Sequence, residues 1–193
     1  MSLNFDPRQP SYITFDSDIY DEGVHQLYKA CTHIVDSGAT ELTIAMHSPG
    51  GSVSKGTALH NFLKSLPLEL TTHNIGDIDS IANVVFLAGK YRYSNPNGRF
   101  MLHGVTRSFD GGARLGEADL LQQLEYVRAD QERIAQTIAR QTKLTVREIK
   151  RAFKNGDNIL TPPEAEQKEI IHGIKDLVVP ANANVLNIAC RRG

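Results

Sequence analysis

The chain of 193 residues is 40% hydrophobic, which is enough for one well-buried domain and rather short for two. Its 21 basic and 22 acidic side chains leave a formal net charge of -1. The overall electrostatic field of the chain therefore does not favour nucleic acid or an anionic membrane as a partner. No apolar run approaches the roughly 20 residues that span a bilayer, and the polar start lacks the pattern of a secretory signal. We therefore expect a cytoplasmic protein that binds neither nucleic acid nor membrane.

Strands and helices alternate along the first half of the chain. Apolar patterning predicts strands over residues 12–15, 41–46, 68–75, 91–94 and 99–102, and helices over residues 21–37, 54–66 and 80–88. Strands that recur with intervening helices predict an α/β domain with a largely parallel sheet, whose functional groups gather at strand ends.

The second half is mainly helical. An amphipathic pattern predicts one long helix over residues 116–142. Thr145, followed three residues later by Glu148, opens a second helix with the sequence of a capping box. Residues 174–179 are predicted to form the closing strand.

These elements set the expected domain boundaries. We expect residues 1–11 to be a short flexible segment and residues 12–180 to form a single domain that includes the long helix. Residues 181–193 are expected to be a C-terminal tail.

Two segments carry the strongest signal for chemistry. Residues 48–51, the glycine loop, read Ser-Pro-Gly-Gly after a strand, and residues 76–80 read Gly-Asp-Ile-Asp-Ser before a helix. A serine at such a strand-to-helix turn can project its hydroxyl from the fold, and the free N–H groups of the helix start can meet negative charge. Together they predict an oxyanion loop that faces the nucleophile Ser80, although turn and capping chemistry explain each segment alone.

Two further segments complete a family pattern. Residues 96–103 read Pro-Asn-Gly-Arg-Phe-Met-Leu-His, and residues 157–165 read Asp-Asn-Ile-Leu-Thr-Pro-Pro-Glu-Ala. In this order and spacing, the four segments resemble the proteolytic subunit of Clp protease (ClpP), and the resemblance extends over about residues 13–179. It implies the ClpP/crotonase-like α/β fold of repeated β-β-α units, in which a long handle helix, here residues 116–142, protrudes.

The resemblance implies a serine endopeptidase that cleaves peptides or unfolded polypeptides through an acyl-enzyme on Ser80. His103 would act as general base and then as general acid, and Asp157 would orient the imidazole. The chain order Ser, His, Asp differs from the orders in chymotrypsin, subtilisin and the α/β-hydrolases, which indicates a separate scaffold for the same geometry.

The same resemblance assigns the groups around the nucleophile. Backbone N–H groups of Gly50 or Gly51 and of Ile81 would meet the oxyanion. An extended peptide substrate would lie as an added strand beside three residues after the glycine loop, Ser52, Val53 and Ser54. Asp79 is unusual at such a site, because its carboxylate opposes the negative oxyanion unless it points away or caps the next helix.

We expect neither a cofactor nor a metal. None of the seven histidines shows metal-ligand spacing with another ligand, and Cys31 and Cys190 are too few for a zinc pattern. The resemblance implies homo-oligomeric rings, either a heptamer or a stacked double ring, and the long amphipathic helix favours an oligomer as well. An AAA+ unfoldase is a further family partner, but the segment before the first predicted strand is shorter than the one that engages it.

Two other functions remain open from the sequence. A catalytically silent ClpP-like ring subunit is favoured by Asp79 and by the short N-terminal segment. A crotonase-type acyl-CoA enzyme accounts for the glycine loop, but it leaves the combination of Ser80, His103 and Asp157 without a purpose.

Overall fold

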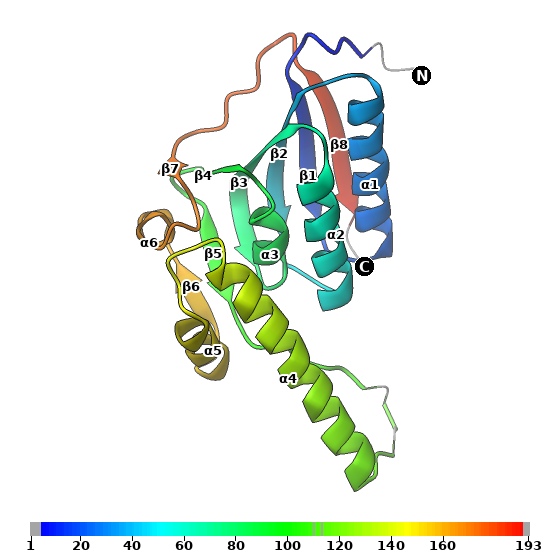
Figure 1. Cartoon of the computed structure of the whole chain (residues 1–193), viewed down its shortest axis with the longest axis vertical. Helices are drawn as coiled ribbons and strands as arrows, with labels where there is room; N and C mark the ends of the chain where they lie inside the picture. Colours follow the sequence, from blue (N-terminus) through cyan, green and yellow to red (C-terminus); the bar gives the residue numbers. More distant parts are fainter. Residues whose placement is uncertain (1–4, 110, 113, 191–193) are drawn as a thin grey trace.

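One mixed sheet forms the centre of the computed structural model, which describes residues 5–109, 111–112 and 114–190 (Figure 1). Within these ranges the strands are β1 (Ser11–Ser17), β2 (Glu41–Ser48), β3 (Glu69–Asp79), β4 (Tyr91–Ser94), β5 (Arg99–Leu102), β6 (Asn158–Leu160), β7 (Gly173–Ile174) and β8 (Asn184–Cys190). The helices are α1 (Asp21–Asp36), α2 (Val53–Ser65), α3 (Ala82–Phe86), α4 (Glu117–Ala139), α5 (Val146–Lys154) and α6 (Pro162–Gln167). The predicted α/β class is confirmed.

The strands follow the order β6-β5-β3-β2-β1-β8, and β4 pairs with both β3 and β7. Each pair is parallel except β5 with β6. Parallel neighbours need long crossover connections, and α1 and α2 supply two of them. The carboxyl ends of β2 and β3 consequently meet at one edge, where the glycine loop and Ser80 lie.

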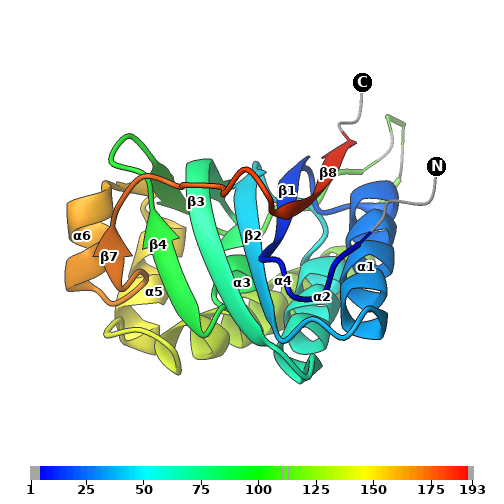
Figure 2. The same cartoon turned by 90° about the horizontal axis from the view of Figure 1, so that it is seen from above.

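The helices α1, α2 and α3 cover one face of the sheet (Figures 1 and 2). Alternate side chains of each strand point to this face, such as the fully buried Phe15 of β1 and Met46 of β2. Burial of each such side chain contributes about 1.5 to 3 kcal/mol. The opposite face carries half-buried polar side chains, including Asp16 and His47.

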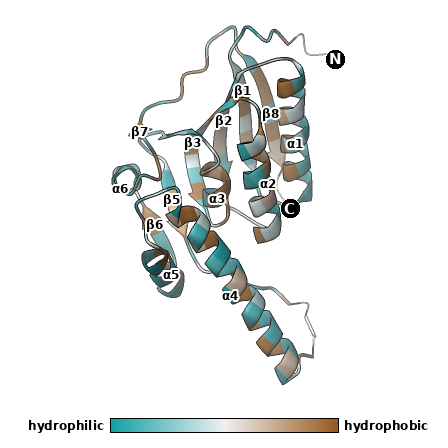
Figure 3. Ribbon diagram, in the orientation of Figure 1, coloured by the Kyte–Doolittle hydropathy of each residue, from teal (hydrophilic) through white to brown (hydrophobic). Residues whose placement is uncertain are grey.

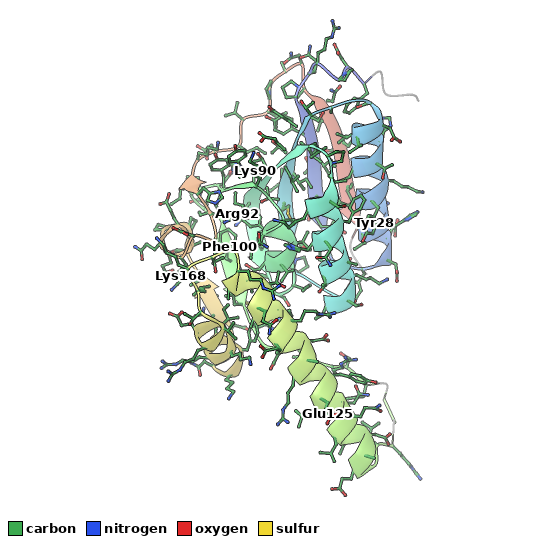
Figure 4. The ribbon with its side chains drawn as sticks, in the orientation of Figure 1. Tyr28, Lys90, Arg92, Phe100, Glu125 and Lys168 are labelled. Carbon is green, nitrogen blue, oxygen red and sulfur yellow. The ribbon has the colours of Figure 1, made fainter. Side chains whose placement is uncertain are left out.

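Helix α4 projects away from the sheet (Figure 1). Its buried residues, Ile134, Ala135 and Ile138, all lie in its last two turns. Its first half mixes polar and apolar residues (Figure 3). Three leucines in this half are exposed, Leu120, Leu121 and Leu124. Glu125 marks the projecting part in Figure 4. No helix within the described ranges is long and apolar enough to cross a membrane.

The C-terminal end differs from the expectation. Residues 184–190, predicted as part of a tail, form β8, which pairs along its whole length with β1. The burial of β8 alternates along the strand, but only Ile188 is fully buried and both Val185 and Ala189 on the exposed side are apolar, so the sequence shows no alternation of apolar and polar residues. Residues 191–193 lie outside the described part.

The predicted closing strand over residues 174–179 is also wrong beyond Ile174. Lys175 N–H still donates to Ser94 O of β4 at 2.9 Å, but the next backbone groups bond to side chains. Lys175 O lies 3.1 Å from His73 Nε2, and Leu177 N–H donates to Asn95 Oδ1 at 3.1 Å. These bonds satisfy the backbone in an irregular path.

Candidate active site

The glycine loop connects β2 to α2 and is held against the segment that follows β1. Ile19 N–H donates to Gly50 O at 2.7 Å, and Ser52 N–H donates to Ile19 O at 3.0 Å. Gly50 N–H is occupied as well, because it donates to Ser48 Oγ at 3.2 Å. The Gly51 N–H lies between these anchor points, and it donates to no other group of the described chain.

A bulge in β3 turns the strand from one neighbour to another. The register of β2 and β3 shifts after the pair Met46 and Asn74 and resumes at the pair Ser48 and Ile78. Two N–H groups in the bulge bond to side-chain acceptors at 2.9 Å, Gly76 to Asn74 Oδ1 and Asp77 to His47 Nδ1. Before the bulge β3 pairs with β4, and after it β3 pairs with β5. The bulge therefore directs the end of β3 toward His103.

Ser80 occupies the turn between β3 and α3 with a φ of 56°, a strained value for a residue other than glycine. This conformation explains why α3 begins at Ala82 and not at Ser80, where the predicted helix begins. Ser80 N–H donates to Met101 O at 2.9 Å, which ties the turn to β5. The side chain is thus presented at the sheet edge, as the sequence predicts for a nucleophile turn.

Asn83 supports this turn and was missed by the sequence analysis. Its buried Nδ2 group lies 3.1 Å from Ile78 O, 3.0 Å from Ser80 O and 2.9 Å from Met101 O. An amide has two hydrogens, so the three carbonyls share them. The available signal was an asparagine three residues after the serine, which alone predicts nothing specific.

His103 lies directly after β5, and its Nδ1 is 2.8 Å from Gly104 O. A carbonyl only accepts hydrogen bonds, so Nδ1 carries the proton and Nε2 of the neutral ring is left as the acceptor. Asp157 lies just before β6 and is exposed. The β5–β6 register pairs Leu102 with Asn158, and its continuation by one residue places Asp157 opposite His103. No hydrogen bond joins these two side chains in the described structure.

A cavity of about 350 Å³ brings the candidate residues together. Ser80, His103, Gly50, Gly51 and Ile81 all line it. Its apolar wall consists of Val53, Leu102, Val105, Ile134 and Phe153. Asp157 does not line this cavity.

The Asp79 carboxylate neither caps α3 nor faces solvent. Its Oδ2 accepts from Arg99 Nη2 at 2.9 Å, while the residue at the N-cap of α3 is Ile81. Burial raises the pKa of the Asp79 carboxyl, and the positive charge of Arg99 opposes that shift. This ion pair depends on the register of β3 and β5, which the sequence does not reveal.

The segment after the glycine loop differs from the expected extended edge. Val53 and Ser54 form the first turn of α2, and Ser52 precedes it as the N-cap residue. Val53 and Ser54 have helical backbone geometry. Ser52 is extended, but its N–H donates to Ile19 O and its carbonyl accepts from Gly56 N–H. Only Val53 of the three lines the cavity.

Comparison with known proteins gives the family. A sequence model of the Clp protease family matches residues 9–177. The chain is 27% identical over 157 residues to ATP-dependent Clp protease proteolytic subunit 2 of Corynebacterium glutamicum, which covers 78% of this chain and 74% of that protein. It is 25% identical over 167 residues to ATP-dependent Clp protease proteolytic subunit 1 of Leifsonia xyli subsp. xyli, and this alignment covers 85% of this chain and 82% of that protein. It is also 27% identical over 157 residues to the ATP-dependent Clp protease proteolytic subunit of Oltmannsiellopsis viridis, and this alignment covers 80% of this chain and 78% of that protein. Since the family match extends over most of the chain and the fold agrees with it, the protein belongs to the Clp protease family.

Proposed function

We propose that the protein is a serine endopeptidase of the Clp type that cleaves peptides or unfolded polypeptides. The observation that carries the proposal is the shared cavity, in which Ser80 on a strained turn, His103 and the glycine loop surround one space of about 350 Å³. The names of the relatives, which are Clp protease proteolytic subunits, support the same class of reaction.

The proton transfers follow from the tautomer of His103. Nδ1 holds its proton against the Gly104 carbonyl, so Nε2 can accept the Ser80 hydroxyl proton as Oγ attacks the peptide carbonyl carbon. Nε2 then gives that proton to the leaving amine, and water hydrolyses the acyl ester by the reverse sequence. Asp157 would take the Nδ1–H from the Gly104 carbonyl and stabilise the charged ring.

The oxyanion donors in this proposal are the N–H groups of Gly51 and Ile81. Both residues line the cavity, and neither N–H donates to another group of the described chain. Gly50 N–H is the weaker candidate because Ser48 Oγ already accepts from it. Loss of one such donor typically costs about 3 to 4 kcal/mol of transition-state stabilisation.

The substrate contacts we propose combine an apolar wall with the polar residues Asp18, Tyr20 and Thr106, which also line the cavity. Val53, Val105, Ile134 and Phe153 form a wall that fits an apolar side chain next to the scissile bond. Ser52 and Ser54, which flank Val53 in the chain, would contribute hydroxyl groups, whose oxygens lie 3.1 Å apart.

We further propose that the chain acts in an oligomeric chamber. Leu120, Leu121 and Leu124 are 53%, 55% and 43% exposed on the projecting part of α4. A soluble surface seldom leaves three neighbouring leucines uncovered, and a second copy would cover them.

Labelling with a fluorophosphonate probe tests the nucleophile. The probe should phosphonylate Ser80, with loss of fluoride, and Ser80→Ala should abolish both the labelling and peptide cleavage. Ser65→Ala, an exposed serine at the end of α2, is the matched control and should change neither. Labelling that survives Ser80→Ala, or assembled wild-type protein that is never labelled, would contradict the assignment.

A catalytically silent subunit remains the second candidate, because His103 bonds to Gly104 O and Asp157 is exposed and outside the cavity. This function predicts no turnover by the chain alone and co-purification with an active related subunit. The fluorophosphonate experiment separates the two.

A further inference from the structure

Three charged side chains lie next to the candidate nucleophile, on the face of the sheet opposite to α1, α2 and α3. The parallel register of β3 and β5 pairs Asp77 with Arg99 and Asp79 with Met101. Side chains of alternate residues share one face, so Asp77 and Asp79 flank the same surface that Arg99 occupies. Asp79 ends β3 and immediately precedes Ser80.

Arg99 joins the two carboxylates. Its Nε donates to Asp77 Oδ1 at 2.7 Å, and its Nη2 donates to Asp79 Oδ2 at 2.9 Å. The guanidinium is planar and its donors form a fixed fork, so this double contact sets the position of the Asp79 carboxylate.

The two carboxylates differ in burial. The Asp77 side chain is 39% exposed, whereas the Asp79 side chain is only 9% exposed. Asp79 Oδ1 is fully buried and has no hydrogen-bond partner in the described structure. A buried carboxylate without a partner is strongly unfavourable, so Arg99 supplies the main compensation for this charge.

We infer that Arg99, anchored by Asp77, is a positioning residue that neutralises Asp79 and thereby keeps its negative charge from opposing the oxyanion at Ser80. The inference rests on the proposed function. Without Arg99, an ionised Asp79 would lie one residue from the nucleophile and two residues from the Ile81 N–H donor, in a site where charges are poorly screened. Asp79 does not itself line the cavity, so its unpaired charge would act on the oxyanion through the electric field.

A double-mutant cycle tests this role. Arg99→Met should slow the phosphonylation of Ser80 by about 10- to 100-fold, the range expected for coupling between groups in contact. Asp79→Asn removes the charge that needs a partner, so the double variant Asp79→Asn/Arg99→Met should recover to within about threefold of Asp79→Asn alone. Arg99→Lys should recover part of the rate. A merely structural ion pair also predicts recovery in the double variant, but only in step with the free energy of unfolding, because Asp79→Asn removes the unpaired buried charge in either case. Labelling rates are therefore compared where urea unfolding shows every variant to be folded, and a rate loss in folded Arg99→Met is the result that supports the positioning role.

The pH dependence gives a second readout. The charged groups that act on Asp79 are Arg99, Asp77, His47 and His103. In Arg99→Met the Asp79 carboxylate opposes the reaction only when it is ionised, so the rate relative to wild type should fall as the pH rises, and Asp79→Asn should remove that trend. A loss that is independent of pH would contradict the inference.

The controls separate the possible failures. Arg8→Met and Asp6→Asn break an ion pair far from the site in sequence, in which Arg8 Nε and Nη2 lie 2.9 Å and 3.0 Å from the two oxygens of one carboxylate, and should leave labelling unchanged. If thermal unfolding shows that Arg99→Met does not fold, Arg99→Gln replaces it in the double-mutant cycle. Wild-type protein without Ser80-dependent labelling overturns the proposed function and this inference together. Normal wild-type labelling with an undiminished Arg99→Met rate, or with no rescue in the double variant, overturns the inference alone.

Discussion

A Cβ atom added to Gly50 would lie 2.7 Å from the Cβ atom of Ser80 and 2.8 Å from Asp79 O. The glycine loop therefore packs directly on the Ser80 turn, and the two segments form one rigid unit although 30 residues separate them in the sequence. Gly50 also has a φ of 90°, which side-chain-bearing residues rarely adopt. Both constraints require glycine here.

Gly50→Ala should inactivate the protein by displacing Ser80. We expect the rate of fluorophosphonate labelling to fall by about 100-fold or more, because a shift of about 1 Å at a reacting atom has effects of that size. The kinetics of labelling measure this effect, and circular dichroism checks that the variant is folded.

Gly38→Ala is the matched control for this change. Gly38 has a similar φ of 85°, but an added Cβ would meet no atom within 4 Å. This variant should lose only the roughly 1 kcal/mol of stability that the conformation costs and keep the wild-type labelling rate. If both variants lost the same fraction of the labelling rate, backbone strain alone, and not contact with Ser80, would explain the effect at Gly50.

Asn83→Asp should damage the same turn from the other side. The carboxylate has no N–H to donate to the carbonyls of Ile78, Ser80 and Met101, so buried acceptors lose their partner. We expect the free energy of unfolding to fall by about 2 to 3 kcal/mol and the labelling rate to fall with it. Urea titration measures the first quantity. Asn61→Asp makes the same chemical change at an exposed position of α2 and should have little effect on either.

Two buried histidines predict loss of stability on mild acidification. Burial lowers the pKa of His60 and of His73 below the ordinary value of 6.5. The unfolded chain then binds protons that the folded chain excludes, so their contribution is complete above about pH 6.5 and is lost as the pH falls below it. Each histidine can contribute up to about 1.4 kcal/mol per pH unit in this window.

Urea unfolding between about pH 7.5 and about pH 5.5 checks this slope. His60→Asn keeps a donor for Val84 O, which lies 2.7 Å from His60 Nδ1, but cannot titrate, so the slope should decrease. Added salt should leave most of the slope in place, because burial is its largest cause. A slope that is unchanged in His60→Asn would rule out this residue as a source.

The exposed leucines of α4 predict an interface. Leu120→Asp combined with Leu124→Asp should lower the native mass of the assembly, because charges at a covered apolar surface cost several kcal/mol unless they are paired. Native mass spectrometry measures the change. Gln122→Glu introduces one charge at an exposed polar position of the same helix and should leave the mass unaltered. An unchanged mass in the leucine variant would exclude this surface as the contact.

The elements with strong local patterns were predictable. Helix α1 was expected over residues 21–37 and extends over Asp21–Asp36, and β4 and β5 have their predicted bounds. In each case apolar spacing or a flanking turn sets the element without help from distant residues. The positions of Ser80 and the glycine loop at adjacent strand ends follow from the same local reading.

The short strands and the polar contacts were not predictable in this way. β6 has only three residues, and β8 carries apolar residues on its exposed side as well as on its buried side, so pairing with β5 and β1 identifies both strands where the sequence does not. The same is true of Asn83, whose three acceptors come from β3, β5 and the turn between β3 and α3.

The sequence by itself determined which residues could form a serine-hydrolase site and in which order they occur, because glycine, serine, histidine and aspartate each have a chemistry that is local to the residue. Only the tertiary structure decided what surrounds them: the bulge that moves β3 from β4 to β5, the contact of Gly50 with Ser80, and the pairing of Asp79 with Arg99. These relationships join strands through register and burial, which depend on the whole sheet and cannot be read from neighbours in the chain.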